Sequence, residues 1–130
     1  MSSASRRYDP AVARAAVDAI RDWIADPDSV AAPGRNAIAL AVRQTARMLA
    51  HDAPGHSVEV RVPPFVAVQC IAGLQHHRGT PPNVVECSPI VWLRLVTGVE
   101  NWDEAAKEAS GSRVSEVSAM LPLLPLQGGK

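Results

Sequence analysis

The side chains best suited to chemistry are four histidines, two cysteines and one pair of neighbouring carboxylates. Imidazoles bind a metal ion when three or four ligands converge, and they act as acids or bases when paired with a second group. His76 and His77 are adjacent, and adjacent residues do not converge on one metal as histidines four apart on a helix can. His51 and His56 flank a turn without Cys, Asp or Glu at ligand spacing. We therefore expect solvated histidines, no metal site and no cofactor.

The cysteines and the carboxylate pair also lack the partners that catalysis needs. Cys70 and Cys87 form no CxxC pair and lie in apolar, strand-like sequence, which predicts buried, reduced thiols. Asp103 and Glu104 are neighbours whose side chains diverge on a helix, and a favourable interaction with the helix N-terminus accounts for them. The sequence contains no nucleophile elbow, dinucleotide-binding loop or phosphate-binding loop motif. We expect no catalytic residues and a protein that is not an enzyme.

The composition fits one domain over residues 1–130, with flexible ends at 1–8 and 127–130. Hydrophobic residues make up 47% of the chain, which is typical of a globular protein. Thirteen basic and 13 acidic residues balance, so the net charge does not steer the protein to nucleic acid. The sequence shows no apolar signal-peptide core and no apolar run of spanning length, and we expect a soluble, cytoplasmic protein.

The first half of the sequence predicts two helices and a hairpin. A helix capped by Asp9, with Pro10 at its first position, is expected to end near Ala25. A second helix is expected from about residue 36 to the Ala-Pro-Gly at 53–55. The strict alternation of SVEVRV predicts a half-buried strand, and FVAVQCIAG, apolar on both faces, predicts a strand covered on both sides.

The second half predicts a short strand at 83–88, followed by a helix capped by Ser88 and ended by Gly98. We expect a further short helix from an Asn101 cap through Ala109, and then a strand in SGSRVSEVS. The apolar segment AMLPLLPL contains prolines that exclude a helix or a central strand, which favours an edge strand or an extended cover. The order of elements predicts an α+β domain in which helices cover a mixed sheet.

The helix at 88–98 is unusually apolar for a small protein, because Arg94 is its one charged residue. It is too short to cross a bilayer, which takes about 20 residues. A sheet and one helical layer can bury only one side of such a helix. The remaining apolar surface predicts either an apolar cavity or a patch for a protein partner.

Residues 83–118, NVVECSPIVWLRLVTGVENWDEAAKEASGSRVSEVS, resemble the small bacterial branch of the sterol-carrier-protein family. The resemblance lies in an ordered set: a strand, a capped helix ending in Leu-x-Thr-Gly at 95–98, a second small helix, Ser-Gly at 110–111 and a strand. The helix and hairpin upstream agree in order, so the similarity spans most of residues 35–120.

This resemblance implies an α/β sandwich of about five strands with a hydrophobic tunnel that holds sterols, fatty acyl chains or phospholipids. It implies no catalytic residues, and it implies a lipid-type ligand with at most transient membrane contact. Two alternatives stay open: an interaction module with a filled cavity, as a homodimer or with another partner, and an accessory domain of an enzyme system. By position in this sequence, the residues expected to line the cavity are Phe65, Val68, Trp92, Leu93, Leu95, Val96, Trp102, Ala105, Ala106, Met120, Leu121, Leu123 and Leu124.

Overall fold

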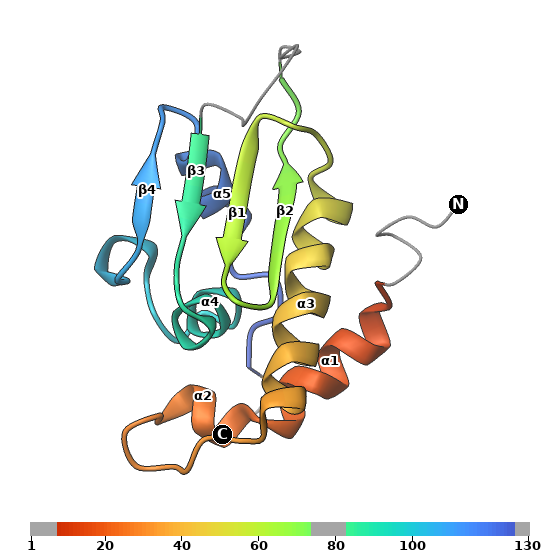
Figure 1. Ribbon diagram of the computed structural model, residues 1–130, viewed down its shortest axis with the longest axis vertical. Coiled ribbons are helices and arrows are strands. Elements are labelled where there is room, and N and C mark those ends of the chain that lie inside the picture. The colour runs from red at the N-terminus through yellow and green to blue at the C-terminus, as the bar shows by residue number, and fades with distance from the viewer. Residues whose placement is uncertain (1–7, 74–82, 127–130) are drawn as a thin grey trace.

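A computed structural model describes residues 8–73 and 83–126 of the protein. Figure 1 shows a four-stranded sheet with the helices gathered beside it and behind it. Most of the expected flexible ends, the His76–His77 pair and the Gly-Gly tail lie outside the described residues. The expected α+β class is confirmed, with four strands among the described residues where the resemblance implied about five.

Three helices form the N-terminal part of the structure: α1 (Pro10–Ala19), α2 (Arg21–Ala25) and α3 (Arg35–Asp52). The cap on α1 is the expected one, since the Asp9 carboxylate accepts hydrogen bonds from the backbone N–H groups of Ala11 at 2.8 Å and Val12 at 3.3 Å. The expected single helix is interrupted at Ile20, whose non-helical backbone separates α1 from α2. α1 packs against α3 (Figure 1).

The sheet contains β1 (Val58–Val62), β2 (Val66–Cys70), β3 (Asn83–Glu86) and β4 (Glu108–Ser110), in the order β2-β1-β3-β4. β1 pairs antiparallel with β2 and parallel with β3, and β3 pairs antiparallel with β4. The alternation read from SVEVRV is confirmed, because Val58, Val60 and Val62 are fully buried while the side chains between them are half-buried.

β2 corrects one expectation, because it is an edge strand with one exposed face. Ala67 and Gln69 are exposed, whereas Cys70 is buried on the face that carries the core. Small residues such as Ala occur both in strands covered on two sides and in edge strands, so the apolar run alone does not distinguish the two. One face of the sheet packs against the helices, and the opposite face remains uncovered within the described residues.

The region after α4 (Pro89–Val96) departs most from the sequence-based expectation. The predicted helix through Ala109 is wrong: a single 3-10 turn, η2 (Trp102–Glu104), is followed by β4, and Asn101 makes no side-chain cap. Pairing with β3 overrides the helical preference of this Ala- and Glu-rich segment. Gly111 follows β4 with a positive φ, and its backbone lies so close to Asn83 that a Cβ would clash.

The predicted strand in SGSRVSEVS is also wrong, because Ser115–Met120 form the helix α5. Val114 and Val117 are three residues apart, and both pack toward the core, Val117 fully buried and Val114 half-buried. On a strand these two side chains would point to opposite faces, whereas a helical turn brings them to one side. The helical spacing was therefore present in the sequence but was outweighed by its Ser and Gly content.

Candidate functional site

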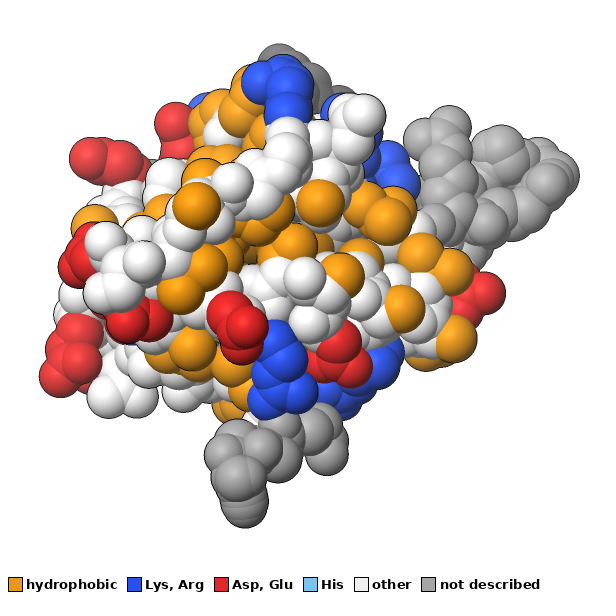
Figure 2. All heavy atoms as spheres, turned by 90° about the horizontal axis from the view of Figure 1, so that it is seen from below, with side chains coloured by type: hydrophobic (Ala, Val, Ile, Leu, Met, Phe, Trp, Pro, Cys, Tyr) orange, Lys and Arg blue, Asp and Glu red, His pale blue; other side chains and the backbone are white. Residues whose placement is uncertain are grey.

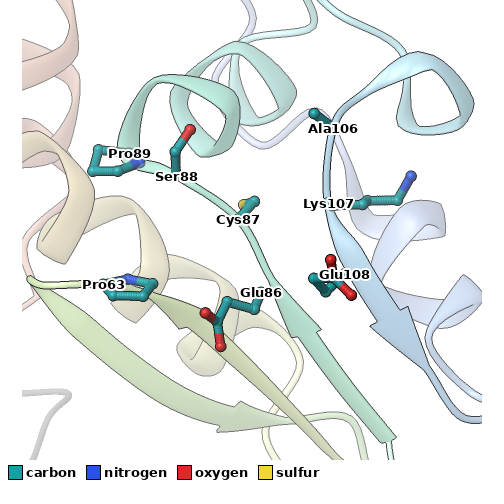
Figure 3. A pocket seen from close by; sticks show the side chains of 8 residues that line it. All are labelled: Pro63, Glu86, Cys87, Ser88, Pro89, Ala106, Lys107 and Glu108. Carbon is teal, nitrogen blue, oxygen red and sulfur yellow. The ribbon is translucent and has the colours of Figure 1, made fainter.

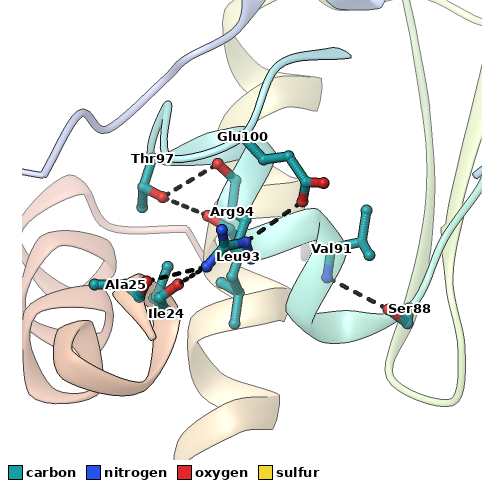
Figure 4. A network of polar contacts seen from close by, with 8 residues as sticks. All are labelled: Ile24, Ala25, Ser88, Val91, Leu93, Arg94, Thr97 and Glu100. Carbon is teal, nitrogen blue, oxygen red and sulfur yellow. Dashed lines mark hydrogen bonds and ion pairs between the residues drawn. The ribbon is translucent and has the colours of Figure 1, made fainter. Parts of the chain in front are cut away.

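The apolar helix α4 lies at the centre of the candidate site. Its N-terminus is capped as expected, with the Ser88 hydroxyl accepting a hydrogen bond from the backbone N–H of Val91 at 3.3 Å and Pro89 at the first position (Figure 4). Four of its eight residues are buried. These are Trp92, Leu93, Leu95 and Val96.

The hydrogen bonds and the turn at the end of α4 give a physical reason for the Leu-x-Thr-Gly pattern. The last carbonyls of a helix have no partner within the helix and need hydrogen-bond donors from elsewhere. The Thr97 hydroxyl donates to the carbonyls of Leu93 at 2.7 Å and Arg94 at 3.3 Å (Figure 4). Gly98 then turns the chain with a φ of 79°, a conformation that favours glycine, and its N–H donates to the carbonyl of Leu95.

The C-terminal segment 121–126 supplies the remaining partners of this helix end. The backbone N–H groups of Leu123 and Leu124 both donate to the carbonyl of Val96 at 3.0 Å, and that of Leu126 donates to Thr97 at 3.3 Å. The guanidinium of Arg14, on α1, donates to the Pro125 carbonyl at 3.1 Å. For residues 121–126 the expected extended cover is confirmed, because the segment crosses the end of α4 and is held there by backbone hydrogen bonds. Ala119 and Met120, which were included in that expectation, instead form the end of α5.

Arg94, the one charged residue of α4, ties this helix to α2. Its guanidinium donates to the carbonyls of Ile24 at 2.6 Å and Ala25 at 3.3 Å, at the negative end of the α2 dipole (Figure 4). The same side chain forms an ion pair with Glu100, with 3.4 Å between Nε and Oε1. The partners of Arg94 cannot be identified from its neighbours in the sequence, although an isolated charge in an apolar helix is a signal for such a partly buried contact.

Beneath α4, the side chain of Trp92 is fully buried and hydrogen-bonded. Its indole N–H donates to the Thr45 hydroxyl of α3 at 2.8 Å, and that hydroxyl donates in turn to the carbonyl of Ala41 at 2.7 Å. Leu93, Val96 and Leu124 belong to the same buried core. Trp92 therefore occupies the space between α4 and α3.

A groove of about 300 Å³ lies at the surface where α4, η2, α5 and the C-terminal segment meet. Three of the residues expected to line a cavity, Leu95, Trp102 and Leu121, come together in its wall. Glu100, Asn101 and Ser118 add polar groups beside them. The ammonium group of Lys107 lies 4.5 Å from the centre of the Trp102 ring and donates to the backbone carbonyl of that residue.

The other expected cavity residues do not line the groove: they lie in the core, beside the core or in a second cleft. Phe65 and Val68 pack against the core from the sheet, and Ala105 is buried. Met120 and Leu123 are half-buried beside the core. Which of the thirteen residues contact a ligand stays a prediction.

A second hollow, a cleft of about 640 Å³, lies between the start of α4 and the strand β4 (Figure 3). Ala106 is the one expected cavity residue in its wall. Glu86 and Glu108, directly opposite each other on β3 and β4, both line it, as does Cys87. Two carboxylates at this position make the cleft unfavourable for an acidic head group.

The thiols are held in the protonated form by burial. Desolvation raises the pKa of Cys87 to about 12, an effect that nearby Lys107 reduces and Glu86 strengthens, and it raises the pKa of Cys70 to about 11. A thiolate is the reactive form of cysteine, so neither residue is prepared for nucleophilic chemistry. Within residues 8–73 and 83–126, no three His, Cys, Asp or Glu side chains lie in an arrangement that could hold a metal ion.

Apolar side chains also reach the surface at the end of the molecule where α2 and α4 lie. Figure 2 shows them as an irregular band across this face, with acidic side chains most numerous at the left and others beside basic side chains at the lower middle. None of the described helices has both the length and the apolar character needed to cross a membrane.

Comparison with known families gives one match. The family described as bacterial SCP ortholog, where SCP denotes sterol carrier protein, matches residues 34–123, from the residue before α3 to the middle of the C-terminal segment. A search of curated proteins found no significant match. The matched range contains α4, its Thr97–Gly98 end and the groove.

Proposed function

The chain belongs to the bacterial SCP orthologs, a sterol-carrier-like family, and on this basis we propose that it binds a lipid or another hydrophobic ligand without catalysing a reaction on it. The observation that carries the proposal is the groove at the end of α4, where Leu95, Trp102 and Leu121 meet. The groove places these apolar side chains beside polar groups of Glu100, Asn101 and Ser118, a combination that suits a ligand with both an apolar and a polar part.

The groove as it stands accommodates only part of a long ligand. Its volume of about 300 Å³ lies at the lower end of the range of small-molecule pockets, which begins at about 300 Å³. Covering about five methylenes yields roughly 4 kcal/mol at about 0.8 kcal/mol each, before the cost of ordering the chain. That gain corresponds to a dissociation constant of only about 1 mM.

We therefore propose that the C-terminal segment 121–126 moves to admit a longer chain. Three backbone hydrogen bonds to α4 and one from Arg14 hold it in place. At about 1 kcal/mol net each, releasing them costs about 4 kcal/mol, and exposing the buried side chain of Leu124 costs about 2 kcal/mol more. Covering about eight further methylenes recovers a similar amount, so a long acyl chain offsets the free energy of opening.

A matched pair of leucines in this segment tests the proposal. Leu121 and Leu126 are both half-buried and both pack beside the core, but of the two only Leu121 lines the groove. We expect Leu121→Gln to weaken binding of a fluorescent fatty acid by at least tenfold and Leu126→Gln to weaken it by less than threefold. Equal effects of the two changes on binding would place the ligand elsewhere.

Solvent extraction of the purified protein followed by mass spectrometry gives the second test. A lipid present at a stoichiometric amount supports the proposal. A protein that carries no lipid and takes up no probe contradicts it.

The filled space under α4 favours a second candidate function, an interaction module. Trp92 is fully buried and its indole N–H is bonded to Thr45, so no ligand is needed to complete this part of the core. In that case the apolar surface in Figure 2 serves a protein partner or a second copy. A stable dimer without lipid and without probe uptake is the result this alternative predicts.

A further inference from the structure

The exposed side of α3 carries positive charge and no negative charge over four turns. Between Arg35 and His51 the sequence contains no Asp or Glu. The exposed or half-exposed positions 36, 40, 43, 47 and 51 follow helical spacing and fall within one arc of the helix. Arg43 and Arg47 lie in this arc, and Arg35 lies at the start of the helix.

A large apolar side chain lies in the middle of this cationic arc. Leu40 is 45% exposed, and among the described residues it is one of two large hydrophobic side chains that are this open to solvent. It lies one helical turn before Arg43, so the two side chains are neighbours on the helix surface. The other exposed hydrophobic residue, Val12, is on α1 and is 39% exposed.

The β1–β2 turn extends the same surface beside α3 (Figure 1). The guanidinium carbons of Arg35 and Arg43 lie 5.0 and 5.8 Å from the centre of the Phe65 ring. Nε of Arg43 also donates to the Phe65 carbonyl at 3.1 Å, which holds its guanidinium at the surface beside the turn. The turn residues Pro63 and Pro64 are exposed and uncharged.

We propose that this surface, formed by Arg35, Leu40, Arg43 and the turn at 63–65, docks the protein on a bilayer that contains anionic lipid. Guanidinium groups match the phosphates of lipid head groups, and an exposed leucine together with an aromatic ring suits the adjoining acyl boundary. Glu59 and Glu86 each form an ion pair with Arg61, and Glu86 and Glu108 share a cleft with Pro63. The cationic charge of the docking surface therefore comes from α3, and it would orient the protein although the net charge is zero. The proposal goes beyond ligand binding, because none of these residues lines the groove at α4.

Co-sedimentation with vesicles tests this docking surface. We expect binding to vesicles of phosphatidylcholine that contain phosphatidylglycerol and little binding to phosphatidylcholine alone. Raising the salt from about 0.1 M to about 1 M should release the protein, because the Debye length falls from about 10 Å to about 3 Å. Equal binding to both kinds of vesicle, or no binding to either, would overturn the proposal.

Variants of Arg35 and Arg43 test whether the positive charge of these two side chains is what binds the vesicles. Arg35→Gln/Arg43→Gln should weaken vesicle binding by on the order of 30-fold, since each basic side chain near such a surface contributes a factor of about five. Arg35→Lys/Arg43→Lys keeps the charge and should retain most of the binding. If the Lys pair fails as completely as the Gln pair, the surface recognises something other than an anionic bilayer.

A matched apolar pair tests the role of the exposed leucine. Leu40→Gln should weaken vesicle binding several-fold, whereas Val12→Gln, at a similarly exposed site on α1, should leave it unchanged. Equal losses would contradict the proposal. Stronger binding to a short DNA duplex than to the anionic vesicles would also contradict it, and would identify a nucleic-acid surface.

Probe uptake measured without vesicles distinguishes this inference from the proposed function. The Arg35 and Arg43 variants should bind the fluorescent fatty acid as the parent protein does. If the parent protein takes up the fluorescent fatty acid but does not bind vesicles, the docking proposal is wrong and the ligand proposal stands. If the parent protein binds vesicles but does not take up the fatty acid, the ligand proposal is wrong and the docking proposal stands.

Discussion

At the scale of single residues, several side-chain polar contacts of the described residues have an identifiable task. The Trp92 indole N–H has one acceptor, the Thr45 hydroxyl, in a place that water does not reach. The carboxylate of Asp9 and the hydroxyls of Ser88 and Thr97 satisfy helix ends. A buried donor that loses its acceptor costs more than the hydrogen bond itself contributed.

The first prediction concerns this indole contact. Thr45→Val keeps the shape of the side chain but leaves the Trp92 N–H without an acceptor, and we expect a loss of about 1–3 kcal/mol in the free energy of unfolding. Thr45→Ser keeps the hydroxyl and should cost about 1 kcal/mol for the lost methyl group. Urea unfolding followed by tryptophan fluorescence measures both. A smaller loss for Thr45→Val than for Thr45→Ser would mean that the hydrogen bond is unimportant.

The second prediction concerns the two thiols. Burial raises the pKa of Cys70 to about 11 and of Cys87 to about 12, whereas an unfolded thiol has a pKa of about 8.5. The native protein therefore holds these protons more tightly than the unfolded chain. Its stability is unaffected by them below about pH 8.5 and falls as the pH rises from there toward the native values.

A thiol-specific disulfide reagent at pH 8 checks this arrangement. We expect both thiols to react slowly in the native protein and within seconds in denaturant. The Cys70→Ala/Cys87→Ala variant should show a shallower loss of stability above pH 8.5 than the parent protein. Fast labelling of either thiol in the native state would show that it is accessible.

At the scale of elements, the C-terminal turn of α4 is held by two partners distant in sequence. Arg94 binds the carbonyl end of α2, and the segment 121–126 binds the carbonyl end of α4 itself. The Arg94 side chain is 23% exposed, so its contacts are partly shielded from water. Each contact joins two elements that local sequence alone does not bring together.

The third prediction follows from the Arg94 contacts. Arg94→Met removes charge-assisted hydrogen bonds to two carbonyls, and we expect a loss of about 1–2 kcal/mol in the free energy of unfolding. Amide hydrogen exchange in α2 should become faster than in α3. Glu100→Gln removes only the ion pair and should cost less than about 1 kcal/mol. Equal costs would mean that the ion pair, and not the α2 contact, is what matters.

The fourth prediction concerns the glycine that ends α4. Gly98 has a φ of 79°, so Gly98→Ala should cost about 1 kcal/mol through backbone strain, and Gly98→Asn should cost less because Asn tolerates this conformation. Thermal unfolding compares the two variants. If Gly98→Ala were as stable as the parent protein, the positive φ at this position would be wrong.

The elements that the sequence predicted well are those with strong local signals. Asp9–Pro10 and Ser88–Pro89 mark helix starts, and the Val alternation marks β1. The larger errors lie after Gly98, where pairing with β3 overrides helix propensity and where the helix α5 contains two Ser residues and follows a Gly-containing stretch. Before Gly98, the break at Ile20 and the exposed face of β2 were also missed. Of the site, the apolar helix could be predicted from its composition. The meeting of Leu95, Trp102 and Leu121 depends on the path of the C-terminal segment, which no local signal encodes.

At the scale of the whole molecule, the proposed ligand binding and the proposed membrane docking involve different surfaces. The groove lies where α4 meets η2, α5 and the C-terminal segment, and the cationic arc lies on α3. A protein that exchanges a lipid with a bilayer needs both a contact with the membrane and a place for the acyl chain. The central claim is that the groove binds a hydrophobic ligand.

The three tryptophans provide the most direct test of that claim. Trp102 lines the groove, Trp92 is buried beneath α4 and Trp23 lies on α2. A brominated fatty acid quenches tryptophan fluorescence by contact, so titration of the parent protein should quench part of the signal to saturation. We predict that Trp102→Phe abolishes this quenching and that Trp23→Phe preserves it. Undiminished quenching in Trp102→Phe, or no saturable quenching in the parent protein, would contradict a ligand site at this groove.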